Sequence, residues 1–243
     1  MLKHPNITRF ATDWLALVAG LTLSVVSLGH AQQTIVEQDF ETISEGFVGR
    51  FGSVSPGPNP YGIEGRWSEF GTDPGTPRVQ VRPDGDGQAV FLRRENASRP
   101  LIGVFNPIQA ATRFALECDL WLSRESHMVV SINNQNIQVA SVLLRTEAPG
   151  IAVWNPRDSA WESVSNQAPS GQWLRLIIDC DYKNESYTVS LADKNGGELF
   201  SAQGLLDPKA VSEGGLNNIL FNPQPGSSED CIVDQVLVNA WFP

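Results

Sequence analysis

The chain has 243 residues, which is enough for one large β domain or two small ones. Its hydrophobic content of 41% supports a globular core, and its 21 glycines and 16 prolines are spread along the chain as turn residues. A formal charge of -10 argues against nucleic-acid binding, because phosphate recognition needs a concentrated basic surface. The composition therefore predicts one globular domain whose partner is not a nucleic acid.

Residues 1–31 have the pattern of a secretory signal peptide. A positively charged start precedes a mostly apolar segment at 15–28, and a small-x-small cleavage motif ends at Ala31. A membrane anchor is the alternative, but a span needs about 20 apolar residues and Asp13 shortens this one. We predict cleavage near Ala31. The mature protein, residues 32–243, would then be secreted, periplasmic or at the cell surface, without membrane insertion.

The mature chain contains about a dozen short alternating segments separated by turn residues. Strands are expected at 34–41, 78–82, 88–92, 101–105, 114–123, 127–132, 137–144, 151–164, 173–182, 187–192, 198–201, 218–221 and 231–240. The Gly/Pro-rich segments 49–60 and 71–77 are expected to be loops, and only 207–213 indicates a helical turn. This pattern predicts an all-β fold with two antiparallel sheets and almost no helix.

Two hairpins are especially clear in the sequence. The first strand of the hairpin 171–196 alternates apolar with polar residues, and the polar segment 183–186 forms its turn. The earlier hairpin turns at 83–87. Asp84 and Asp86 lie in that turn but lack the third acidic residue and the distal glutamate of a calcium loop, so we expect them to form a turn only.

Three cysteines lie in the mature chain, and disulfides can persist in an exported protein. Cys118 and Cys180 share the apolar sides of their strands and could meet, whereas Cys231 has the opposite parity to its aliphatic neighbours. The sequence leaves open whether one disulfide forms or all three are buried or half-buried thiols. Closely spaced Cys or His partners are missing, which argues against a zinc site.

A set of short motifs along the chain points to a known superfamily. They are Asp39-Phe40-Glu41, the segment 85–90, Gly171-Gln172-Trp173, Asp181-Tyr182, Tyr187-Thr188-Val189 and Asp234-Gln235-Val236. In this order they resemble the concanavalin A-like lectin/glucanase superfamily, and within it the laminin-G-like domains. The resemblance covers most of the mature chain, roughly residues 34–241, and implies a jelly roll of two curved sheets. It also implies a concave face or rim loops that often bind sugars.

Asp234 is the strongest candidate for a metal ligand. It shares one side of the last strand with aliphatic residues, where an unpaired charge would be very unfavourable. Calcium prefers several oxygen ligands, which Asp39 and Glu41 on the first strand could supply if the two terminal strands pair. The resemblance makes Asp234 and Glu41 the expected ligands of a structural Ca²⁺, with Asp39 as a further candidate. The alternative is that Asp234 bonds to the backbone or to an arginine such as Arg175.

Sugar binding needs an exposed aromatic ring beside planar hydrogen-bonding side chains. Trp154 and Trp161 bracket a turn, so their indoles could face each other across a hairpin. The candidate ligand-binding residues are Trp154, Trp161, Trp67, Asn155 and Arg157. The alternative is that tryptophans brace the core or cover a sheet edge, which the sequence favours for Trp121 and Trp173.

The sequence contains no convincing reaction centre. Glycosidases of this superfamily carry Glu-x-Asp-x-x-Glu, which holds two carboxylates about 5 Å apart. Glu117 and Asp119 begin that motif, but Leu122 replaces the final acid, and His127 stands alone. We predict a non-catalytic carbohydrate-binding or adhesion module of bacterial origin. The alternatives are a glycan-active enzyme using Glu117, Asp119 and His127, and a structural envelope protein.

Overall fold

The computed structural model describes most of the chain from Ala31 onward. The described residues are 31–41, 46–47, 51–54, 65–69, 78–92, 101–108, 111–134, 137–148, 150–166, 168–213, 216–224 and 230–243. For β2, β3, β4 and most of β7, whose bounds follow, only the backbone is described. The predicted signal peptide lies outside these residues apart from Ala31.

The 17 strands of the described chain form two antiparallel sheets. The nine-stranded front sheet has the order β15 (Glu198–Leu205), β14 (Ser186–Asp193), β13 (Trp173–Asp181), β8 (Arg113–Leu122), β17 (Cys231–Phe242), β6 (Gln88–Leu92), β5 (Arg78–Val81) and β2 (Gly46–Phe47), with β1 (Ala31–Gln38) also paired to β17. The eight-stranded back sheet has the order β12 (Ala160–Ser165), β11 (Ile151–Asn155), β10 (Ile137–Arg145), β9 (His127–Asn134), β16 (Leu216–Pro223), β7 (Leu101–Ile108), β4 (Gly65–Glu69) and β3 (Phe51–Val54).

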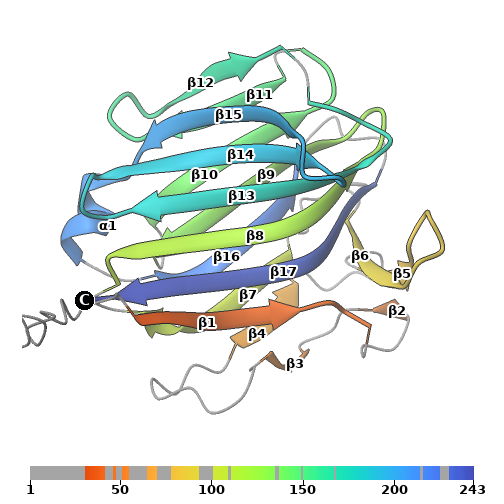
Figure 1. Ribbon diagram of the computed structural model, residues 1–243, viewed down its shortest axis with the longest axis horizontal. Coiled ribbons are helices and arrows are strands. Elements are labelled where there is room, and N and C mark those ends of the chain that lie inside the picture. Colours follow the sequence, from red (N-terminus) through yellow and green to blue (C-terminus); the bar gives the residue numbers. More distant parts are fainter. Residues whose placement is uncertain are drawn as a thin grey trace, which may run out of the picture.

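The two sheets are stacked, with the front sheet toward the viewer in Figure 1. Helix α1 (Pro208–Glu213) follows β15 at one side of the sandwich, as the sequence predicts. No helix within the described ranges is long and apolar enough to cross a bilayer. The all-β, two-sheet fold class expected from the sequence is confirmed, but the loop expected at 49–60 is partly wrong because β3 lies within it.

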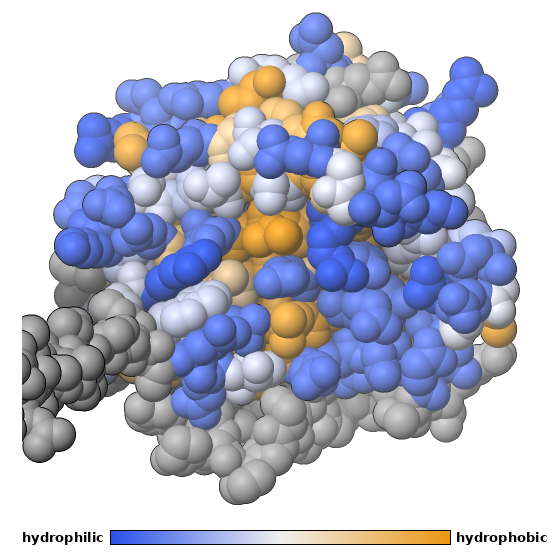
Figure 2. Space-filling view, viewed as in Figure 1, coloured by the Kyte–Doolittle hydropathy of each residue, from blue (hydrophilic) through white to orange (hydrophobic). Residues whose placement is uncertain are grey.

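The hydrophobic core lies between the sheets and follows from the two-residue period of the strands. On β8, every second side chain from Phe114 to Leu122 is fully buried, whereas Glu117 and Asp119 point outward. Figure 2 shows the resulting outer face of the front sheet, where hydrophilic side chains surround a small hydrophobic area. Polar recognition is therefore possible on this face without opening the core.

Tyr187 on β14 joins the two sheets at one edge. Its fully buried hydroxyl lies 2.9 Å from the carbonyl oxygens of Ser141 on β10 and of Trp154 on β11. Gly204 on β15 lies against the ring, and a Cβ at that position would be 2.3 Å from Cζ of Tyr187. This edge therefore depends on a glycine that leaves space for the phenol ring.

The first and last strands are neighbours in the front sheet. β1 pairs antiparallel with β17, from Ala31 opposite Phe242 to Gln38 opposite Val236. The predicted pairing of the terminal strands is therefore found. Just beyond this pairing, the register of β17 against β8 shifts between Asp234 and Leu237, and Gln235 has a positive φ of 49°.

All three cysteines are buried free thiols in the structure. Cys118 and Cys180 face the core as expected, but their cross-strand neighbours are Leu176 and Phe114. Burial raises the pKa of the Cys118 thiol well above its ordinary value, which makes the thiol a poor nucleophile. Of the two arrangements the sequence leaves open, the structure has the buried thiols.

Candidate ligand-binding pocket

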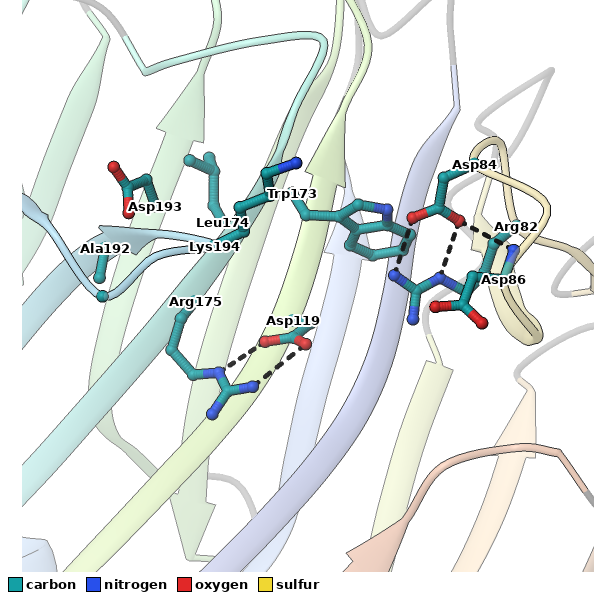
Figure 3. A pocket seen from close by; sticks show the side chains of 11 residues that line it. Arg82, Asp84, Asp86, Asp119, Trp173, Leu174, Arg175, Ala192, Asp193 and Lys194 are labelled. Carbon is teal, nitrogen blue, oxygen red and sulfur yellow. Dashed lines mark hydrogen bonds and ion pairs between the residues drawn. The ribbon is translucent and has the colours of Figure 1, made fainter.

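A pocket of about 510 Å³ lies on the outer face of the front sheet, between the β5–β6 turn and the β14–β15 turn (Figure 3). Its lining residues are Arg82, Asp84, Asp86, Asp119, Trp173, Leu174, Arg175, Ala192, Asp193, Lys194 and Gly196. Seven of these eleven side chains are charged. Such a wall suits a ligand with many hydrogen-bonding groups.

The two turns at the ends of the pocket are held by their own aspartates. In the β5–β6 turn, the backbone N–H of Asp86 donates to Oδ1 of Asp84 at 3.3 Å. In the β14–β15 turn, Oδ1 of Asp193 accepts hydrogen bonds from the backbone N–H of Asn195 at 2.8 Å and of Gly197 at 2.9 Å. These Asx turns fix the backbone that presents Asp86 and Lys194 to the pocket.

Between the turns, the floor of the pocket carries an ion pair set by strand register. Arg175 on β13 lies opposite Asp119 on β8. The Arg175 guanidinium donates from Nε to Oδ1 of Asp119 at 2.6 Å and from Nη2 to Oδ2 at 3.2 Å. This bidentate geometry satisfies both oxygens of Asp119.

Arg82 connects three elements at one wall of the pocket. It donates to both oxygens of Asp84, at 3.2 and 3.1 Å, and its Nη1 donates to Oδ2 of Asp234 at 2.9 Å. Its guanidinium also lies over the Trp173 ring, 4.2 Å from the centroid. The β5–β6 turn is thereby fixed against β13 and β17.

Asp234 is a fully buried carboxylate, with 0% exposure. Its pKa is raised to about 6, mainly by burial and also by the negative charges of Asp119 and Glu41; the backbone N–H of Gln235 and the charge of Arg82 act in the opposite direction. Arg175 is the arginine partner that the sequence suggests for Asp234. The partner is instead Arg82, because Arg175 is paired with Asp119.

Trp173 contributes a buried donor rather than an open ring face. The residue is 9% exposed, and its ring lies edge-on to Trp121 with centroids 5.8 Å apart. Its buried indole N–H points toward the Asp84 carboxylate (Figure 3), but not in the geometry of a full hydrogen bond. Burial raises the pKa of Asp84, but the hydrogen bonds from Arg82 and the Asp86 backbone, and that indole, bring it below its ordinary value.

The three carboxylates expected to bind calcium already have hydrogen-bond donors. Asp234 accepts from Arg82 and from its neighbour's backbone, Glu41 accepts from the backbone of Gln88 at 2.9 Å, and Asp39 accepts from the backbone of Glu41 at 3.1 Å. Within the described ranges, no three His, Cys, Asp or Glu side chains gather as a metal site. The Arg82 guanidinium already supplies the positive charge beside Asp234, so this set of carboxylates does not fit Ca²⁺ as it stands.

The tryptophan hairpin expected from the sequence is present. Trp154 and Trp161 are cross-strand partners on β11 and β12, with ring centroids 5.4 Å apart and an interplanar angle of 66°. Trp161 is 37% exposed. The Asn155 side chain shapes the turn by accepting from the backbone of Arg157 at 2.9 Å, and the side chain of Trp67 lies outside the described structure.

The residues of the possible acid/base set do not assemble on one sheet. Glu117 and Asp119 point outward from β8 in the front sheet, whereas His127 begins β9 in the back sheet. Leu122, at the position of the missing acid, is fully buried in the core. Asp119 is also committed to Arg175.

Sequence reasoning overlooked most of the pocket. Asp84 and Asp86 are expected only to form a turn, Trp173 only to be structural, and Asp193 and Lys194 only to close a strand. A usable signal exists in the outward parity of Asp119 with Trp121 and of Trp173 with Arg175, which places charged and aromatic side chains on one face.

Neither a protein-family model nor a curated protein sequence matches this chain. Solved structures do match it. The lectin UEA-II complexed with galactose has a TM-score of 0.54 at 11% identity, covering 88% of this chain and 100% of that chain. The basic winged bean lectin with Tn-antigen has a TM-score of 0.52 at 10% identity, covering 88% of this chain and 100% of that chain. A sialidase matches with a TM-score of 0.50 at 11% identity, over 86% of this chain but only 18% of the sialidase.

These similarities define the fold class. The chain has the concanavalin A-like jelly-roll fold that is found in legume lectins, as the resemblance in the sequence implies.

Proposed function

We propose that this protein is a non-catalytic carbohydrate-binding or adhesion module, and that the pocket on the front sheet holds the sugar. The observation that carries the proposal is the pocket itself. Its volume of about 510 Å³ is in the usual range for small-molecule sites, and seven charged side chains line it. Carboxylates, guanidinium groups and an ammonium group are suitable partners for the hydroxyl groups of a sugar. The lectin-like fold supports the same class of ligand.

A glycan array on residues 32–243 tests this function. Wild-type protein is expected to bind a defined set of glycans, and Asp86→Asn is expected to weaken that binding because Asp86 is an exposed carboxylate of the pocket lining. Glu37→Gln is the matched control, because Glu37 is an exposed acid on β1, away from the pocket. An array without any bound glycan would refute the lectin function, and equal weakening by the two variants would refute the pocket as its site.

The Trp154–Trp161 hairpin is a second candidate location for the sugar. Its support is the exposed indole of Trp161 beside the polar turn that contains Asn155 and Arg157. If this surface holds the glycan, Trp161→Ala removes binding on the array while Asp86→Asn leaves it intact. The opposite result assigns the sugar to the pocket.

A glycan-active enzyme remains the alternative on this fold. Its expected product is a new reducing end or an unsaturated sugar after incubation with polysaccharides. The dispersed positions of Glu117, Asp119 and His127 argue against it, because general acid/base catalysis needs both groups within reach of one bond. Release of such a product by wild type but not by Asp119→Asn would replace the lectin proposal.

Export is part of the proposal as well. Signal cleavage near Ala31 would place the N-terminus of the mature protein at Gln32, inside β1. N-terminal sequencing of protein recovered from the medium or periplasm of an expressing bacterium checks this position. Full-length protein retained in the cytoplasm would contradict it.

A further inference from the structure

We infer that the pocket prefers glycans that carry a protonated amino group and disfavours acidic glycans. This inference rests on the proposed function and specifies its ligand class. Its basis is the number of pocket charges that remain unpaired.

Both arginines of the pocket are already neutralised. Arg82 binds Asp84 and Asp234, and Arg175 binds Asp119 through two hydrogen bonds. Because protein carboxylates already balance these charges, an anionic sugar would gain less from either guanidinium than from an unpaired one. In each arginine, the Nε and Nη2 groups that could bind an anion through two hydrogen bonds already bind an aspartate of the protein.

The carboxylates of the pocket are less fully used. Asp86 has no hydrogen bond or ion pair through its carboxylate among the described residues, and it is exposed at the β5–β6 turn. Asp193 uses Oδ1 for two backbone N–H groups, which leaves Oδ2 accessible to a donor. Both can accept hydrogen bonds from an ammonium group.

Lys194 is the one cation of the lining that has no ion pair in the described structure. The lining carries four aspartates against three cationic side chains, and Asp234 adds a fifth carboxylate behind Arg82. The whole chain is acidic, with a formal charge of -10. The field in the pocket therefore favours cationic ligands over anionic ones.

Trp173 forms the wall of the pocket behind Asp84. The Arg82 guanidinium lies over its ring, 4.2 Å from the centroid, and its buried indole N–H points toward the Asp84 carboxylate (Figure 3). Asp84 is therefore engaged by groups of the protein. Asp86 and Asp193 are the carboxylates that would receive the amino group of the ligand.

Chitosan and chitin oligosaccharides of equal length provide the test, because they differ mainly in whether the amino group is free or acetylated. Isothermal titration at low salt, below the pKa of the sugar ammonium group, compares them with a neutral oligosaccharide and an oligogalacturonate. We expect chitosan oligosaccharides to bind about tenfold more tightly than chitin ones, because each exposed charge contact changes affinity a few-fold. Asp86→Asn should reduce this ratio, and Glu37→Gln, an exposed acid on β1, is the matched control.

The outcomes separate the inference from the function on which it rests. Equal or tighter binding of the oligogalacturonate overturns the charge preference while leaving the lectin function in place. A preference for chitosan that survives in Asp86→Asn but falls in Glu37→Gln overturns the assigned pocket. If neither these sugars nor the glycan array shows binding, the proposed function fails and the inference fails with it.

Discussion

Replacing Arg82 by alanine leaves the buried Asp234 carboxylate without its cation. The side chains of Arg82 and Asp234 are 15% and 0% exposed, and Nη1 and Oδ2 are 2.9 Å apart. Removing one partner of a buried pair typically lowers the free energy of unfolding by about 3–5 kcal/mol. We expect about 3 kcal/mol above neutral pH, because Asp234 can escape part of the penalty by taking up a proton.

The sign of the pH dependence follows from the pKa of Asp234. That pKa is about 6 in the folded protein, above its ordinary value of 3.8, and the loss of Arg82 raises it further. At low pH the carboxyl group is neutral in both proteins, so Arg82→Ala is least harmful there. Its effect on stability should grow as the pH rises through 6 and beyond.

Arg113→Ala is a matched control, because Arg113 also combines an ion pair with a ring contact. Arg113 binds Asp179, and its guanidinium lies 4.5 Å from the Trp241 centroid. The side chains of Arg113 and Asp179 are, however, 50% and 28% exposed. We expect its loss to lower stability by only about 0–1 kcal/mol. Urea unfolding followed by tryptophan fluorescence, at acidic and alkaline pH, compares both variants. An Arg82→Ala effect no larger than that of Arg113→Ala, or one that does not grow with pH, would refute the reasoning.

Four further outcomes are expected. Gly204→Ala should lower stability by about 3 kcal/mol in urea unfolding, because its Cβ would collide with the Tyr187 ring. Gly85→Ala is the control: its Cβ would contact no other atom, but its φ of 76° should make the change cost roughly 1 kcal/mol. Equal effects of the two variants would contradict this prediction. Tyr187→Phe should lower stability by about 1–2 kcal/mol, because the carbonyls of Ser141 and Trp154 lose the hydroxyl hydrogen that they share. An unchanged unfolding midpoint would argue against that bond. Relative to Asp234→Asn, wild type should lose roughly 3 kcal/mol of stability between about pH 4 and pH 7, because folding raises the pKa of Asp234 from 3.8 to about 6. A stability difference between the two proteins that stays constant with pH would contradict this prediction. If Asp234 does bind calcium, EDTA should lower the melting temperature of wild type but not of Asp234→Ala, whereas an unchanged wild-type value argues for the Arg82 pair alone.

Most strands could be predicted from the sequence because the evidence for them is local, although β2, β3 and β4 were not expected. Trp154 and Trp161 could be paired from the turn between them, and the inward side of β8 could be assigned from a two-residue period. The pairing of the terminal strands required the resemblance as well. Each of these inferences depends on short-range chemistry or on a motif order that many jelly rolls share.

The partner of Asp234 could not be predicted in the same way. Asp234 and Arg82 are 152 positions apart, and their contact depends on the strand order β17–β6–β5 and on the irregular backbone at Gln235. Parity placed Asp234 on one side of its strand but said nothing about which arginine covers it. The pocket has the same origin, because Asp86 and Lys194 approach only when β5–β6 and β14–β15 occupy the same sheet.

The pairing of β1 with β17 also determines how the domain responds to mechanical force. Ala31 and Phe242 are cross-strand neighbours, so opposite pulls at these two residues act across the strands rather than along them. Under that load the β1–β17 hydrogen bonds would break one after another, as in a zipper. Force from Ala31 to the β12 edge would instead act through much of the sandwich. A domain pulled at these two residues would therefore open first at β1, on the far side of β17 and β8 from Arg175 in the pocket floor.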